Sequence, residues 1–273
     1  MADDFRRPVE TFTARTPRVV AASKLHRAAA RRKAGRFLVE GFNSVDAAVR
    51  AGAVVELFAT EDALDRFGEL VAAASASGRP VSPIDASAAA SLAETVTTTG
   101  VFATCDAAAV TAPAEAVIAA GREAGVLIVP VAANDPGNAG TIIRMADALG
   151  AGGVLFAGDS VDPLGGKAVR SSAGSLFNVP VARERDVAAV EEMLADAGFS
   201  TLATAMDGET VLGRDPLPGD PVAWLFGNEA HGLPEDVLAR ATARVSIPIR
   251  GGAESLNLAT AAAMCMWETA RGR

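Results

Sequence analysis

The chain has 273 residues, of which 50% are hydrophobic, and a formal net charge of −8 at pH 7. A chain of this length and apolar content can bury more than one core, so we expect two folded domains and exclude global disorder. Two cysteines and two histidines are too few for a convincing metal cluster, and neither a signal core nor a membrane-length apolar run is present, so we expect a cytoplasmic protein without a metal site.

Positive charge is concentrated at the start of the chain. Residues 1–36 form a basic segment with few acidic residues, so the rest of the chain is more acidic than the net charge indicates. Such a segment on an acidic protein is typical of a surface that contacts phosphates, although a solvated basic tail is an alternative interpretation. The side chains that we predict to contact nucleic-acid phosphates are Arg18, Lys24, Arg27, Arg31, Arg32, Lys33 and Arg36.

A small α/β domain is predicted over residues 37–106, because strand-like and helix-like segments alternate. The expected strands are 37–41, 54–59, 80–84 and 101–105, and the expected helices are 44–51, 61–76 and 86–96. An alanine-rich stretch, 107–124, follows as a linker that can be partly helical. Phe12, Phe37 and Phe42 are scattered, and we assign them to the core rather than to a platform for stacking bases.

A second alternating series is predicted over residues 125–273. Its alternation favours a parallel sheet covered on both faces, which binds ligands at the carboxyl ends of its strands. Three polar or glycine-rich loops fall at such ends, at 134–140, 227–233 and 250–257. The expected strands are 126–131, 153–157, 179–182, 201–205, 222–226 and 245–249, and the expected helices are 139–149, 167–176, 187–197, 235–241 and 256–270.

The first loop carries Asn138 and, six residues later, Arg144, which could face one ligand. An arginine fork suits phosphate or carboxylate, although a surface arginine on an ordinary helix is an alternative interpretation. Gly137 and Gly140 permit close backbone approach, but they do not complete a dinucleotide fingerprint. A nicotinamide-dependent oxidoreductase is therefore disfavoured.

The second and third loops each add polar groups at a strand end. Gly227 lets the backbone approach a ligand, and Glu229 places a carboxylate beside it. In the third loop, Ser255 and Asn257 open an apolar helix, where either side chain can cap exposed amides. His231 has no evident carboxylate to orient it, so we interpret it as a loop residue rather than a general base.

Three motifs in order resemble those of the SpoU-type RNA ribose 2′-O-methyltransferases, which belong to the knotted SPOUT class. They are NDPGNAGTIIRMADALGAGGV, LFGNEAHGLPEDVL and SIPIRGGAESLNLATAAAM. Upstream, RKAGRFLVEGFNSVDAAVRAG resembles the accessory RNA-binding domain of many members. The resemblance implies a small α/β RNA-binding domain followed by a parallel-sheet domain with a deep trefoil knot.

The resemblance also implies a methyl donor, S-adenosylmethionine, and roles for particular residues. Gly227, Ile247 and Leu256 would supply backbone contacts to it, and Asn257 would help to shape its pocket. The implied catalytic set is Arg144, Asn138, Glu229 and Ser255. Because a guanidinium stays protonated, we interpret Arg144 as positioning phosphate and stabilising developing charge rather than as a base.

Finally, the resemblance implies a homodimer in which Arg144 and Asn138 complete the partner's site, and an RNA substrate bound by the basic segment. The domain arrangement looks most like enzymes that modify 23S ribosomal RNA, including those that confer thiostrepton resistance. Transfer RNA as the substrate and a non-catalytic RNA-binding homologue are the alternatives.

Overall fold

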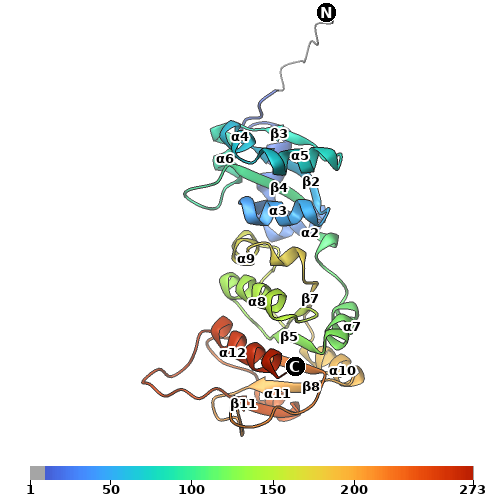
Figure 1. The fold of residues 1–273 in the computed structure, drawn as a ribbon, viewed down its shortest axis with the longest axis vertical. Helices are drawn as coiled ribbons and strands as arrows, with labels where there is room; N and C mark the ends of the chain where they lie inside the picture. Colours follow the sequence, from blue (N-terminus) through green and yellow to red (C-terminus); the bar gives the residue numbers. More distant parts are fainter. Residues whose placement is uncertain (1–9, 273) are drawn as a thin grey trace, which may run out of the picture. The chain divides into compact units, whose positions relative to one another are not determined.

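The computed structural model describes residues 10–272, so residues 1–9 of the predicted basic segment lie outside the described residues. The described chain forms two compact units (Figure 1). One runs to Ala109 and includes Leu164–Gly166, and the other comprises Val110–Pro163 and the chain from Lys167 onward. Among the described residues, no helix is both long and apolar enough to cross a membrane.

The first unit contains the predicted small α/β fold. Its four-stranded sheet has the order β1-β4-β2-β3, in which β4 runs antiparallel to both of its neighbours and β2 and β3 are parallel. The strands are β1 (Arg36–Glu40), β2 (Val54–Ala59), β3 (Val81–Pro83) and β4 (Val101–Asp106). The helices are α1 (Pro17–Ser23), η1 (Lys24–His26), α2 (Ala28–Ala34), α3 (Phe42–Arg50), α4 (Glu61–Arg66), α5 (Gly68–Ala76), α6 (Ala86–Leu92) and η2 (Ala107–Ala109).

The basic segment is folded from Pro17 onward and is not a solvated tail. Val19, Ala22 and Leu25 recur at three-residue spacing, and all three are buried with Phe58 and Phe102 of the sheet. Burying this apolar stripe fixes α1 and η1 on the unit. The basic side chains are therefore carried by an ordered surface.

The helix predicted over 61–76 is two helices, because Phe67 has non-helical backbone angles (φ −116°, ψ 38°). The Phe67 ring stacks on Phe42, with centroids 4.7 Å apart and planes 26° apart. Phe42 is 37% exposed, so our assignment of it to the core was wrong; it begins α3, beyond the buried strand. Phe37, inside β1, is fully buried as predicted.

The helix predicted over 86–96 ends at Leu92, where the backbone of Ala93 becomes extended. The loop that follows is tied to the buried carboxylate of Glu40, which accepts hydrogen bonds from the Glu94 amide (3.1 Å) and the Thr95 hydroxyl. A side chain on β1 therefore holds the loop that leads into β4.

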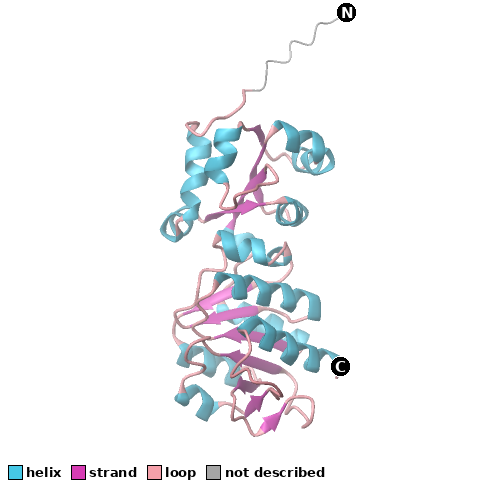
Figure 2. Ribbon diagram, turned by 90° about the vertical axis from the view of Figure 1, so that its left-hand side faces the viewer, coloured by secondary structure: helices cyan, strands magenta, loops and turns pink. Residues whose placement is uncertain are grey.

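The second unit contains the predicted parallel sheet. Its seven strands have the order β7-β6-β5-β10-β8-β11-β9, every pair is parallel, and helices cover both faces (Figure 2). The strands are β5 (Val126–Pro130), β6 (Val154–Ala157), β7 (Val181–Glu184), β8 (Ser200–Thr204), β9 (Thr210–Val211), β10 (Val222–Phe226) and β11 (Ala243–Ser246). The helices are α7 (Ala114–Ala124), α8 (Pro136–Leu149), α9 (Gly166–Ser171), η3 (Ser175–Phe177), α10 (Val187–Asp196), α11 (Glu235–Arg240) and α12 (Leu258–Arg271).

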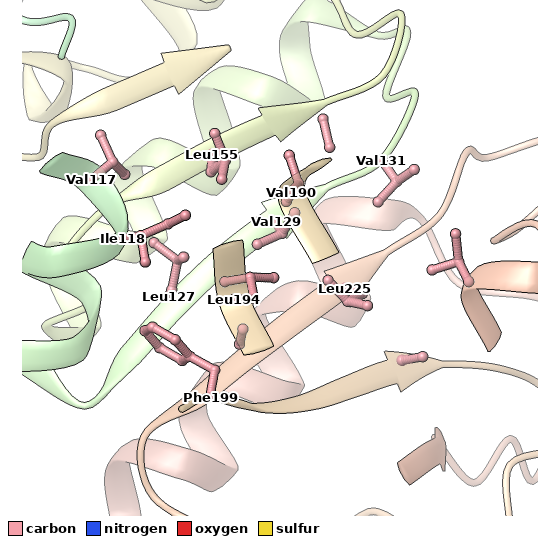
Figure 3. Packing of buried hydrophobic residues seen from close by; sticks show 14 of the residues in the cluster. Val117, Ile118, Leu127, Val129, Val131, Leu155, Val190, Leu194, Phe199 and Leu225 are labelled. Atoms are coloured by element: carbon pink, nitrogen blue, oxygen red, sulfur yellow. The ribbon is translucent and has the colours of Figure 1, made fainter. Parts of the chain in front are cut away.

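The core of this unit lies between the sheet and α7, α10 and α11 (Figure 3). Leu127 and Val129 of β5 are buried with Leu225 of β10, Val117 of α7 and Val190 of α10. Alternate residues of a strand face opposite sides of the sheet, so these side chains share one face. This packing fixes the two central strands whose ends carry the first and second loops.

On the opposite face, α12 is held against the sheet by Trp224 of β10, whose Nε1 donates a hydrogen bond to Thr269 Oγ1 (2.9 Å). Helix α12 also packs against α8. The start of α12 carries the end of the third loop, so these contacts place that end beside the first loop.

Three expectations for this unit change. The predicted linker 107–124 is partly helical, as expected, but its helix α7 packs into the core of the second unit. The strand predicted over 245–249 lies at Ala243–Ser246 instead, and Pro248, which has no amide N–H, lies beyond it. The two-residue strand β9 was not predicted. The trefoil knot stays a prediction, because the strand order does not establish it.

Candidate active site

The three predicted loops follow β5, β10 and β11 of one parallel sheet. Strands β5 and β10 are neighbours, and β11 is separated from β10 by β8. Because parallel strands end at the same edge, the three loops are gathered there. This edge is the candidate active site.

Asn138 joins the three loops. Its Nδ2 donates to Glu229 Oε1 (2.7 Å), and its Oδ1 accepts a hydrogen bond from Asn257 Nδ2 (2.9 Å). Asn138 is buried, so both ends of its amide are committed within this chain. The structure thus brings together three of the predicted site residues, one from each loop.

Asn257 also caps α12. Its Oδ1 accepts hydrogen bonds from the amides of Ala259 (3.0 Å) and Thr260 (3.3 Å) while its Nδ2 reaches Asn138. A serine at this position could provide the cap, but its single oxygen could not occupy the separate positions of Oδ1 at the α12 amides and Nδ2 at Asn138. Asparagine is therefore required by the cap and the loop contact together.

Gly227 is required by the shape of the second loop. A Cβ built at this position would lie 2.1 Å from the carbonyl carbon of Gly232 and 2.2 Å from the Leu233 nitrogen. The loop closes on itself here, with Asn228 N donating to Gly232 O (3.1 Å) and Gly232 N donating to Asn228 O (2.8 Å). Any side chain at Gly227 would force this turn open.

Asn228 is a positioning residue that the sequence did not single out. Its Nδ2 donates to the Ala132 carbonyl (2.8 Å), and its Oδ1 accepts from the Ala230 amide (2.8 Å). Ala132 has a positive φ of 51°, which is unusual for a residue with a side chain. The Asn228 bridge therefore holds the strained backbone just before the first loop against the second loop.

The first loop is anchored at Asp135, which was also not predicted. Its Oδ1 accepts a hydrogen bond from the Asn138 amide (2.9 Å) as the N-cap of α8, and its Oδ2 accepts one from Lys167 Nζ (2.9 Å). The Lys167 hydrogen bond, followed by the backbone bond from Asn138, lowers the pKa of this carboxyl from its ordinary value of 3.8. The available signal in the sequence was an aspartate just before a predicted helix, where its carboxylate can accept a hydrogen bond from the amide three residues later.

Arg144 does not share the buried side of α8 with Asn138. Six residues of helix rotate the two side chains about 120° apart, so the two leave α8 in different directions, and their facing one ligand stays a prediction. Arg144 is exposed and forms no ion pair with the residues that the structure describes. Its guanidinium is available to a ligand or to another subunit.

The third loop is open. Within residues 10–272, residues 247–256 form no hydrogen bonds with the rest of the chain, and Ser255 and Leu256 are exposed while Ile247 is half-buried. In Figure 1 this segment projects from the body of its unit between β11 and α12. Its backbone N–H and C=O groups are therefore free to bind a ligand.

The basic side chains that we predicted to contact phosphates have different environments in the first unit. Arg31 is buried, and its Nη1 donates to the carbonyls of Leu25 and His26 (2.9 Å each), so we assign it a structural role. Arg18 pairs with Glu56 (3.1 Å). Arg18 is exposed as well, but the exposed members that form no ion pair with the described residues, and remain the candidates, are Lys24, Arg27, Arg32, Lys33 and Arg36.

Two family models match this chain in order. The model of the SpoU rRNA Methylase family matches residues 125–267, and that of the MRM3-like substrate binding domain matches residues 16–103. The chain is 30% identical over 255 residues to the 23S rRNA (guanosine(2553)-2'-O)-methyltransferase RlmP of Bacillus subtilis, which covers 93% of this chain and 96% of that protein.

Solved structures agree along nearly the whole chain. An AdoMet-bound rRNA methyltransferase from Sinorhizobium meliloti superposes with a TM-score of 0.84 at 28% identity, covering 96% of this chain and 98% of that one. The SpoU methyltransferase AviRb from Streptomyces viridochromogenes, in complex with AdoMet, gives 0.79 at 30% identity, covering 95% and 98%. The chain therefore belongs to the SpoU rRNA methylase family.

Proposed function

We propose that this protein transfers a methyl group from S-adenosylmethionine to a ribose 2′-hydroxyl in 23S ribosomal RNA, in the cytoplasm. The observation that carries the proposal is the hydrogen-bonded set Asn138–Glu229–Asn257, which joins three loops at the ligand-binding edge of a parallel sheet. The substrate class rests on the Bacillus subtilis relative, which is named as a 23S rRNA 2′-O-methyltransferase.

The segment 247–256 fits a ligand that is held by backbone atoms, because its N–H and C=O groups have no partners among the described residues. We assign backbone contacts with the donor to Gly227, Ile247 and Leu256, and to Asn257 the task of fixing the start of α12. When bound, S-adenosylmethionine supplies an electrophilic methyl group on a positively charged sulfonium.

Asn138 and Glu229 act by positioning. Asn138 is buried and committed to its two partners, so it holds the loops in register rather than contacting a ribose directly. Ser255, which is exposed in the open loop, remains the candidate for contact with the acceptor. A rigid arrangement of loops is what aligned attack at a single carbon requires.

Arg144 is the residue that we assign to the acceptor phosphate and to the charge that develops on the ribose oxygen. A guanidinium cannot take up the hydroxyl proton, because it is already protonated. The proton therefore passes to a phosphate oxygen or a water. Removing one such charge-stabilising donor typically lowers kcat by about 10²–10³.

Methyl transfer is tested with the purified chain, radiolabelled S-adenosylmethionine and unmodified RNA, followed by mapping of ribose methylation in cells with and without the gene. We expect label in 23S rRNA and the loss of one 23S mark. Loss of a tRNA mark would overturn the rRNA assignment. Binding of the donor without transfer to any RNA would identify a non-catalytic homologue instead.

We propose further that the active form is a homodimer. Helices α8 and α12 pack together, and α12 exposes Met264 (42%) and Trp267 (59%) three residues apart on one face. Large apolar side chains that are exposed side by side favour a partner surface. Arg144 is exposed on α8, so a second copy could place it at the donor site of the first, a role that Asn138 cannot share.

Mixing two inactive variants tests this arrangement. Arg144→Ala and Asn257→Ala should each abolish methyl transfer, the second by releasing the start of α12. If Arg144 serves the partner's site, mixed dimers contain one site with both residues intact, and mixing after denaturation and refolding should recover activity. Absence of recovery, with mixed dimers confirmed by mass, would show that Arg144 acts within its own chain.

A further inference from the structure

The first unit has its own ligand-sized cavity, at the ends of strands β1 and β2 and the start of β4. The backbone connects these ends, because Gly41 N donates to Val101 O (3.1 Å) and Thr60 N donates to Gly100 O (2.9 Å). The cavity has a volume of about 470 Å³, within the range of about 300–1,000 Å³ that is common for ligand pockets.

The cavity lining is polar but not strongly charged. Four threonines and one oppositely charged pair contribute, and five alanines supply an apolar floor. The polar members are Thr60, Asp62, Arg66, Thr95, Thr98 and Thr99. Hydroxyls can both donate and accept hydrogen bonds, so this lining can match the mixed edge of a nucleobase.

Several of these groups are available to a ligand. Asp62 and Arg66 form no ion pair with the described residues, and the Thr99 hydroxyl has no hydrogen-bond partner there. Thr95, in contrast, is tied to the buried carboxylate of Glu40, which holds the threonine-rich loop against the cavity. The site therefore combines a loop that Glu40 holds in place with polar groups that are available to a ligand.

An aromatic pair adjoins the cavity through Arg66. The Arg66 guanidinium lies 5.0 Å from the centroid of the Phe67 ring, and Phe67 stacks on Phe42. Because Phe42 is 37% exposed, part of its ring is open to solvent. Aromatic rings and arginine guanidinium groups are the surfaces on which unpaired RNA bases stack.

Charge favours a base over a phosphate at this position. Helix α4 begins with Glu61 and Asp62, and Asp65 follows, all of them exposed, so the helix that contributes Asp62 to the cavity carries three acidic side chains. A phosphate would be repelled here, whereas a neutral base would not. Phosphates are better served by the exposed basic side chains of α2 and its neighbours in the same unit.

We infer that the cavity and Phe42 together form a site for unpaired nucleotides of the RNA substrate, one base entering among the threonines and a neighbouring base stacking on Phe42. This inference rests on the proposed RNA-methylating function. It assigns to the first unit the recognition of a single-stranded or looped-out RNA element rather than of a continuous duplex.

The test uses the full chain and a short single-stranded RNA that carries one 2-aminopurine, whose fluorescence is quenched on stacking. Wild type should quench the single strand, whereas adding it to the same strand in a duplex, where the probe is already stacked on its neighbours, should cause no further quenching. Phe42→Ala should abolish the quenching and weaken RNA binding by about 5- to 150-fold, the range for loss of one base stack. Phe42→Tyr should retain both.

A matched threonine pair separates recognition from folding. Thr99→Val removes a hydroxyl that lines the cavity, whereas Thr97→Val removes one on the same loop that does not line it. We expect Thr99→Val to raise the KM for RNA with little change in kcat, and Thr97→Val to match wild type. Unchanged Tm and donor affinity would confirm that both variants fold.

Two outcomes overturn the inference in distinguishable ways. If Phe42→Ala and Thr99→Val bind and methylate RNA like wild type, this site does not bind RNA, while the proposed function stands. If wild type neither binds nor methylates any RNA, the proposed function fails and the inference fails with it.

Discussion

At the residue scale, the active-site edge depends on side-chain amides that each serve two partners. Asn257 caps α12 and contacts Asn138, and Asn228 bridges Ala132 and Ala230. An amide can do this because it carries a donor and an acceptor at opposite corners of one rigid group. Neither an aspartate nor a leucine of similar size could replace it.

Gly227→Ala should inactivate the enzyme by distorting the second loop. The added methyl would lie 2.1 Å from Gly232 C, closer than two non-bonded atoms can approach. Overpacking of this kind typically costs about 1–3 kcal/mol, so both the free energy of unfolding and the donor affinity should fall. Gly68→Ala is the control, because no atom lies within 4 Å of a Cβ there and the residue is remote from the three loops in sequence and lies in the first unit. Equal behaviour of the two variants in thermal melts and calorimetry would contradict this interpretation.

At the element scale, helix α8 carries the buried Asn138 near its start and the exposed Arg144 two turns later. Its N-terminus is organised by Asp135, which pairs with Lys167 and caps the Asn138 amide. A single cap therefore determines both where the helix begins and where the Asn138 side chain lies.

Asp135→Ala should lower stability by about 0.5–2 kcal/mol, the usual cost of removing an N-cap, and should also reduce activity. Because the pKa of Asp135 is lowered in the folded state, its contribution is complete above its ordinary value of 3.8 and is lost as the pH falls through the lowered pKa. Denaturant unfolding of wild type and variant should thus differ at pH 7 and converge in acid.

Asp186→Ala is the matched control for that helix cap. Asp186 caps α10 by accepting a hydrogen bond from the Ala189 amide (3.2 Å), on a helix that contributes no residue to the candidate site. We expect a similar loss of stability with unchanged methyl transfer. Loss of activity in both variants would mean that Asp135 affects activity only through stability.

At the scale of the whole molecule, an acidic protein carries a localised basic surface on its first unit. The exposed members of the predicted set lie on α1, η1, α2, β1 and the residue that joins η1 to α2, whereas Arg31 is buried. Net charge alone would argue against RNA binding, but the potential at the surface depends on where the charges lie.

The double variant Arg32→Glu/Lys33→Glu should weaken RNA binding and make it less dependent on salt. Each phosphate that the protein neutralises adds about 0.7–0.9 to the slope of log K against log salt concentration, so the slope should become shallower by that amount for each phosphate that the variant no longer binds. Donor affinity should not change. Arg122→Glu, which reverses an exposed charge on α7, is the control, and an equal change in slope there would show that only total charge matters.

Much of the element pattern could be predicted because apolar periodicity is local. The strand 54–59 was predicted at its observed bounds, and the parallel sheet followed from alternation of strands and helices. Prediction failed where tertiary contacts override propensity. The helix predicted over 61–76 breaks at Phe67, whose ring stacks on Phe42, and α7 packs Val117 and Ile118 into the core although it was predicted only as part of a linker.

For the site, the sequence by itself determined which loops carry chemistry and which residue types they contain, because motif order and spacing are properties of the chain. The tertiary structure decided which side chains meet: Asn138 with Glu229 and Asn257, but Arg144 turned outward and Arg31 turned inward. Contacts between residues that are 91 and 119 positions apart depend on strand order and helix rotation, which no local pattern encodes.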